Sequence, residues 1–150
     1  MTLSTASDSR NPDEVKKAKE VFATFLNRAL KANNKSEILI KQTLNAGQRF
    51  VAYGDEITVN GREPTKYSYR KVYENVIQAT DFNKNQLNNS GYIVHSLQVA
   101  VWAFHNYDNF KDGLLAIVSL GGDIDTNAAV YKQLANAYYR RNNISSKSNR

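Results

Sequence analysis

Hydrophobic residues recur at intervals of three and four near the start of the chain, after a polar leader over residues 1–11. This spacing places them on one face of a helix, while lysine and glutamate residues occupy the other face. The stripe consists of Val15, Ala18, Val21, Phe22, Phe25, Leu26, Ala29 and Leu30. Proline suits the first turn of a helix, where its missing N–H would be unpaired anyway. The pattern therefore predicts a helix that begins at Pro12 and ends at Asn33-Asn34.

The middle of the chain alternates between helical patterns and breaks. Ser36 and Glu37 can begin a second helix, which would carry Ile38, Leu39, Ile40 and Leu44. Residues 53–66 contain glycine, asparagine and proline in combinations that form turns, so they predict a loop. Apolar positions within residues 72–77 indicate a third helix, and residues 83–89 read as a polar loop.

The last third of the chain is the most hydrophobic. Residues 92–104 are apolar nearly all round, which predicts a central buried helix. Residues 110–120 predict another helix that is mostly core, and residues 127–139 form an amphipathic stretch. Since these helices are apolar on more faces than a few neighbours can cover, we expect an exposed apolar patch, with oligomerisation or poor solubility as its consequence.

Strand-like alternation is scarce, so the sequence predicts an all-α protein, a bundle of five or six helices. Its 150 residues suffice for one compact domain. We expect a leader over residues 1–11, a helical domain over residues 12–140 and a disordered basic tail over residues 141–150.

Composition narrows the functional classes. The chain has no cysteine, which excludes disulfides and thiolate metal sites and suits the cytoplasm or another reducing compartment. No apolar run reaches the roughly 20 residues that span a bilayer, and the leader is too polar for a signal peptide. The net charge of +6 is modest. The basic tail has no aromatic residues that could stack on bases, so a solvated end is favoured over a nucleic-acid contact.

One short segment concentrates the candidate chemistry: Gly121-Gly122-Asp123-Ile124-Asp125-Thr126. An apolar run precedes the diglycine and an amphipathic stretch follows it, so the carboxylates would converge at a turn that opens a helix. Carboxylate and hydroxyl oxygens are ligands suited to Mg²⁺ or Ca²⁺ and poor ligands for zinc. The segment thus predicts an oxygen-ligand metal site at Asp123, Asp125 and Thr126.

This segment has three other interpretations. The simplest is a polar turn in which an aspartate caps the following helix, and the residues alone leave it open. An EF-hand loop fails because Ala128 and Leu134 stand where that loop needs glycine and a bidentate glutamate. An aspartyl-phosphate nucleophile is disfavoured, since the diglycine would break the strand before Asp123 and Asn127 replaces a small hydroxyl or β-branched residue.

Four motifs occur in order along the chain. They are Ser90-Gly91-Tyr92, the Ala-x-Trp-Ala-Phe that ends at Phe104, the Gly-Gly-Asp-x-Asp-Thr segment, and the Gln-Leu-Ala-x-Ala-Tyr-Tyr that ends at Tyr139. Together they resemble the carboxy-terminal half of the ADP-ribosylglycohydrolases. The strong resemblance covers Ser90 to Tyr139, and a weaker one extends back to Asn11-Pro12.

The resemblance implies a hydrolase that uses two Mg²⁺ ions to cleave ADP-ribose from a modified protein side chain. Asp123, Asp125 and Thr126 would be metal ligands, while Ser90, Gly91, Tyr92, Gly121 and Gly122 would line the ADP-ribose cleft. Family members are longer and carry an early Gly-Asp-rich segment and a Thr-Asp-Asp metal motif. Neither occurs here before Asp123. We therefore expect one side of a two-sided site, with a second chain as one source of the rest.

Other residues of this half have two interpretations. His95 invites a general-base role, but a lone helical histidine is more often a hydrogen-bonded core residue, so no catalytic residue is assigned. Trp102 and Phe104 are expected in the core. Lys132, Asn136 and Arg140 replace the small residues common in the family, and their bulk could disturb packing against a partner helix.

Three functional hypotheses remain. The first is the Mg²⁺-dependent hydrolase, acting here through a half-site. The second is a non-catalytic binder of ADP-ribose or a nucleotide, which keeps the Ser90-Gly91-Tyr92 segment and lacks the two-metal centre. The third is a truncated gene product without activity of its own.

Overall fold

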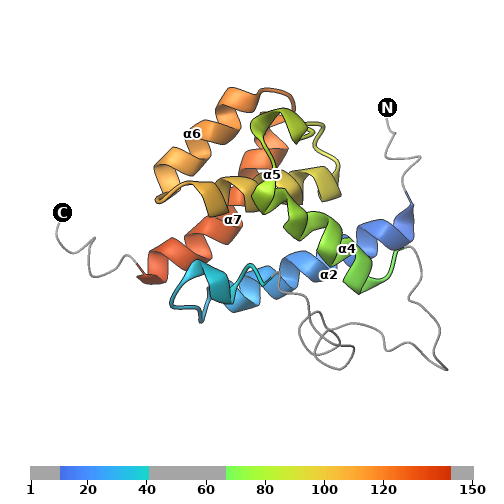
Figure 1. Ribbon diagram of the computed structural model, residues 1–150, viewed down its shortest axis with the longest axis horizontal. Coiled ribbons are helices and arrows are strands. Elements are labelled where there is room, and N and C mark those ends of the chain that lie inside the picture. The colour runs from blue at the N-terminus through green and yellow to red at the C-terminus, as the bar shows by residue number, and fades with distance from the viewer. Residues whose placement is uncertain (1–10, 41–66, 143–150) are drawn as a thin grey trace.

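The computed structural model describes residues 11–40 and 67–142, and everything below concerns these ranges. They hold five α-helices and short 3₁₀ turns, and no strand, so the all-α prediction is confirmed (Figure 1). The α-helices are α2 (Pro12–Ala29), α4 (Tyr69–Ile77), α5 (Ile93–Asn106), α6 (Phe110–Leu120) and α7 (Ile124–Asn142). The 3₁₀ turns are η1 (Lys35–Glu37), η3 (Gln78–Asp81) and η4 (Lys84–Gln86).

Helix α2 begins as predicted and ends earlier. The side chain of Asn11 accepts a hydrogen bond from the backbone N–H of Asp13 at 2.7 Å, and proline follows at the first helical position. The helix ends at Ala29 rather than at Asn33-Asn34. Leu30, the last member of the predicted stripe, is 57% exposed and lies just after the helix, where its backbone N–H still donates to the carbonyl of Leu26 at 3.1 Å.

The predicted second helix is only a 3₁₀ turn where the structure describes it. Ile38 and Leu39 are buried after η1, whereas Leu44 lies outside the described residues, as does the predicted loop over residues 53–66. The third helix is confirmed as α4. The polar loop over residues 83–89 contains the turn η4.

Helix α5 is the centre of the core, as predicted. It packs against α2, α4, η3, α6 and α7, and residues 96–104 are all buried (Figure 1). Trp102 and Phe104 are among them, which confirms their assignment to the core. No helix among the described residues is long and apolar enough to cross a membrane.

Helix α6 has the predicted bounds but not the predicted burial. Only Gly113 and Ile117 are buried, while Leu115 is 53% and Val118 44% exposed. The reason is that α6 packs by one face on α5 and α7, which leaves its other face to solvent. Apolar side chains are thus exposed, and self-association stays a prediction.

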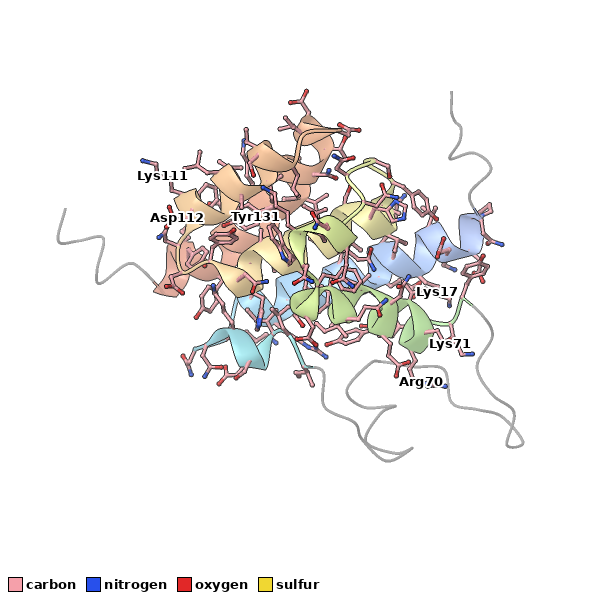
Figure 2. The ribbon with its side chains drawn as sticks, turned by 45° about the horizontal axis from the view of Figure 1, so that its top comes forward. Lys17, Arg70, Lys71, Lys111, Asp112 and Tyr131 are labelled. Atoms are coloured by element: carbon pink, nitrogen blue, oxygen red, sulfur yellow. The ribbon has the colours of Figure 1, made fainter. Side chains whose placement is uncertain are left out.

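Gly113 marks the close approach of α6 to α7. A side chain there would overlap the Tyr131 ring, whose hydroxyl donates a hydrogen bond to the carbonyl of Phe110 at 2.9 Å. Figure 2 shows Tyr131 between the two helices, with Lys111 and Asp112 on the outer side of α6.

Lys35 joins η1 to the end of α5. Its ammonium donates to the carbonyls of Phe104 at 2.5 Å and Tyr107 at 2.6 Å, and it lies 4.7 Å and 5.0 Å from the ring centroids of Phe104 and Tyr139. Burial lowers the pKa of Lys35 from 10.5 to about 8, and the negative charge of Asp108 opposes this by raising the pKa to a smaller extent. The lysine therefore makes the stability of the fold depend on pH.

We expect the stability to rise between about pH 8 and pH 10 and to fall at higher pH. In the first window the unfolded chain holds the Lys35 proton more tightly than the folded chain, so raising the pH favours folding. Burial raises the pKa values of Tyr131 and Tyr139, so their ionisation above about pH 10 favours unfolding. Urea midpoints across this range test the sign. Lys35→Met should lose the rise and keep the fall, and a rise that persists in this variant would contradict the assignment.

Candidate metal-binding and ligand-binding site

Two segments predicted to carry chemistry meet in the fold. We call residues 88–92, before α5, the Ser90 loop, and residues 121–126, at the start of α7, the Asp123 turn. The backbone N–H of Asp123 donates to the carbonyl of Asn89 at 2.9 Å. The amide side chain of Asn89 donates to the carbonyl of Leu120 at 2.8 Å. The two segments are therefore hydrogen-bonded on both sides of the diglycine.

Glycine is required where these segments touch. Gly91 has φ +87°, and a Cβ there would overlap the carboxylate and Cβ of Asp123. Gly122 has φ +67°, and a Cβ there would overlap Asn89. Gly121 has φ +73° with open space around it, so only its backbone conformation favours glycine. Gly91 and Gly122 thus allow the Ser90 loop and the Asp123 turn to touch, while Gly121 provides the backbone conformation of the turn.

Asp123 caps helix α7. Its Oδ1 accepts a hydrogen bond from the backbone N–H of Thr126 at 3.2 Å. The interpretation of this segment as a turn with a helix-capping aspartate is therefore correct for Asp123. Asp123, Asp125 and Thr126 are all exposed to solvent. Acidic side chains in a first turn are favoured by the helix dipole, and this stabilisation offsets part of the repulsion between the two carboxylates. The structure brings the three predicted metal ligands into one exposed turn.

A complete metal cage does not form from the described parts of the chain. Across residues 11–40 and 67–142, no group of three or more histidine, cysteine, aspartate or glutamate side chains could hold a metal ion. Two carboxylates and one hydroxyl are a donor set that fits a hard cation such as Mg²⁺, which requires further oxygen ligands to complete six. The Asp123 turn therefore fits one side of a magnesium site.

The Ser90 loop is braced by hydrogen bonds. The Ser90 hydroxyl lies 2.8 Å from Nδ1 of His95 and accepts from the backbone N–H of Tyr92 at 3.2 Å. The Tyr92 hydroxyl donates to Oε1 of Glu14 at 2.5 Å, which ties the loop to the start of α2. The rings of Tyr92 and His95 also meet edge to face, with their centroids 5.5 Å apart.

This geometry corrects one prediction and adds one residue. His95 is hydrogen-bonded as expected, but it is only partly buried at the start of α5 and is not a core residue. Glu14 was missed, because its only signal was an acid in the first turn of a distant helix. Its contact with Tyr92 depends on the packing of α2 against α5.

Asn127 is the second residue that sequence reasoning missed as a structural link. It is 1% exposed, and its side chain accepts from the Ser96 hydroxyl at 2.6 Å and donates to the carbonyl of Asn89 at 3.3 Å. The available signal was its register. Asn127 precedes the buried Tyr131 and Leu134 by four and seven positions, which places a polar residue on the buried face of α7.

Two further features lie away from this junction. Lys132, Asn136 and Arg140 are exposed on α7, so their bulk disturbs no packing among the described residues. A cavity of about 210 Å³ shares no residue with the Ser90 loop or the Asp123 turn. It is lined by Asn27, Arg28, Lys31, Ala32 and Glu37.

Comparison with known proteins identifies the family. The model of the ADP-ribosylglycohydrolase family matches residues 9–148. A curated ADP-ribosylarginine hydrolase, Tri1 of Pseudomonas putida (strain GB-1), is 28% identical over 138 residues, covering 92% of this chain and 32% of that protein. Tri1 of Serratia proteamaculans (strain 568), also named an ADP-ribosylarginine hydrolase, is 41% identical over 61 residues, covering 41% of this chain and 17% of that protein. No solved structure gives a significant match.

The chain belongs to the ADP-ribosylglycohydrolase family, since the family model covers nearly all of it. It spans a third or less of the length of these two curated relatives. The resemblance drawn from the four motifs is confirmed. The fold brings the Ser90 loop beside the Asp123 turn, and it also packs Phe104 of α5 against Tyr138 and Tyr139 of α7.

Proposed function

We propose that this chain takes part in hydrolysing the glycosidic bond between ADP-ribose and a protein side chain. The observation that carries this proposal is the contact between the Ser90 loop and the Asp123 turn, in which Gly91 packs against the carboxylate of Asp123. Both curated relatives are named ADP-ribosylarginine hydrolases, which supports arginine as the side chain released.

The Asp123 turn would hold Mg²⁺ through Asp123, Asp125 and Thr126. Bound there, Mg²⁺ would orient the ribose hydroxyls and lower the pKa of a water molecule. The described residues supply one side of such a site. We propose that the remaining ligands come from a part of the protein outside this chain or from a second chain.

The chain's own residues would bind and orient the ligand. Helices α5 and α7 both begin at this junction, and the positive end of a helix dipole favours the phosphate oxygens of a ligand such as ADP-ribose. Glu14 accepts a hydrogen bond from the Tyr92 hydroxyl and so fixes the position of this ring within the Ser90 loop. Of the three glycines, Gly121 has open space where a side chain would stand, so a ligand could approach its backbone closely.

Hydrolysis of an ADP-ribosylated arginine peptide tests the proposal. The chain is assayed with and without Mg²⁺, alone and mixed with the amino-terminal segment of a longer family member. We expect turnover only in the mixture and only with Mg²⁺. Absence of turnover in every combination, while the intact relative is active in the same assay, would contradict a catalytic role.

A second candidate is a non-catalytic ADP-ribose binder. It is favoured by the absence of a three-ligand acidic group among residues 11–40 and 67–142, together with the intact Ser90 loop. Calorimetric titration with ADP-ribose discriminates between the two. Binding that is indifferent to Mg²⁺ and to Asp125→Asn favours the binder, whereas no binding at all rejects it.

A further inference from the structure

We propose that Asn127 is a positioning residue that fixes the Asp123 turn against the Ser90 loop by holding the carbonyl of Asn89. The part of this inference that concerns metal binding rests on the proposed function. The part that concerns the geometry of the turn does not.

The orientation of the Asn127 side chain follows from its neighbours. A backbone carbonyl only accepts hydrogen bonds, so the atom of Asn127 that faces the carbonyl of Asn89 at 3.3 Å must be the NH₂ group. Its Oδ1 then accepts from the hydroxyl of Ser96, which is fully buried on α5, at 2.6 Å. One buried amide therefore links α5, α7 and the Ser90 loop.

The carbonyl of Asn89 has two donors, and this makes Asn127 more than a core contact. It accepts from the backbone N–H of Asp123 at 2.9 Å and from the side chain of Asn127 at 3.3 Å. The side chain of Asn89 is held in turn by the carbonyl of Leu120. Displacing this carbonyl would move the anchor of Asp123 and the residue before Ser90 together.

Burial makes the hydrogen bonds of Asn127 costly to lose. Asn127 is 1% exposed and Ser96 is fully buried, so neither can replace a lost partner with solvent without opening the helix pair. Mg²⁺ tolerates little departure from octahedral geometry. A buried residue that fixes the backbone of Asp123 therefore controls whether the exposed carboxylates can meet a metal in a productive arrangement.

The test compares three variants of the full chain. Asn127→Leu removes both polar groups at similar size and leaves the Ser96 hydroxyl unpaired. Combining it with Ser96→Ala removes that unpaired group, which should restore much of the lost stability without restoring a donor to Asn89. Tyr131→Phe is the matched control, because it removes a hydroxyl of the same helix one turn later, which donates to the carbonyls of Phe110 and Asn109, and these lie outside the Asp123 turn.

Amide hydrogen exchange at Asp123 is the first readout. In Asn127→Leu and in the double variant we expect the Asp123 amide to exchange about tenfold faster than in wild type, after correction for global stability. In Tyr131→Phe we expect no comparable change. Equal exchange at Asp123 in the double variant and in Tyr131→Phe would overturn the inference.

Magnesium titration is the second readout, followed through the resonances of Asp123 and Asp125. We expect the double variant to bind Mg²⁺ about tenfold more weakly than Tyr131→Phe, because a displaced carboxylate loses ideal geometry. If wild type shows no response to Mg²⁺, the proposed metal site fails. The exchange measurement would then decide the positioning role of Asn127 by itself.

Discussion

Gly91→Ala should destabilise the chain by about 1–3 kcal/mol and displace the Asp123 turn. Part of the cost is backbone strain, since alanine rarely adopts the φ of +87° found here. The rest is steric, because the new Cβ would overlap the carboxylate and Cβ of Asp123. As the Cβ of Asp123 is involved, rotating its side chain cannot relieve the overlap, and the backbone must move.

A double-mutant cycle separates the two causes. In an Asp123→Ala background most of the overlap is absent, so Gly91→Ala should cost less there, with a coupling of about 1 kcal/mol measured by urea unfolding. The matched cycle with Asp125→Ala should be additive, because nothing in the contact at Gly91 involves that side chain. Equal costs of Gly91→Ala in all backgrounds would show that the carboxylate of Asp123 contributes nothing to the cost, which would then come from backbone strain and from the Cβ of residue 123.

The local sequence pattern predicted where the helices of this chain lie better than it predicted which of their side chains are buried. The bounds of α6 were predicted from its apolar run and the diglycine after it, and the structure adds that Asn109 caps the first turn and that Gly121 follows the last at a positive φ. Its burial could not, since Leu115 and Val118 look like core residues in any local window. Whether they are covered depends on which helices pack beside α6, and that is a property of the whole fold.

The candidate site also has a part that the sequence could predict and a part that it could not. The acidic turn and its glycines could be identified from residue type and order. The links that fix the turn could not, because Glu14, Asn89 and Asn127 act on partners far along the sequence. Asparagine occurs in many loops for local reasons, so its residue type alone does not reveal a long-range contact.

Asp125→Asn should abolish the Mg²⁺ response of the chain with little effect on its stability. Asp125 is exposed, so the substitution removes a ligand charge and no packing. The lost helix-dipole interaction, about 0.3–1 kcal/mol, is offset by the relief of repulsion from Asp123. The matched control is Asp112→Asn, since Asp112 is an exposed acid in the first turn of α6, away from the Asp123 turn.

Asp123 should behave differently from Asp125, because it caps α7 as well as facing the site. Asp123→Asn keeps a capping acceptor and should remain stable while losing Mg²⁺, whereas Asp123→Ala should also lose about 1 kcal/mol. Titration of wild type should give weak binding, on the order of millimolar, since three oxygen ligands leave half of the six positions to water. Micromolar affinity in the isolated chain would contradict a one-sided site, and a response retained in Asp125→Asn would remove that residue from it.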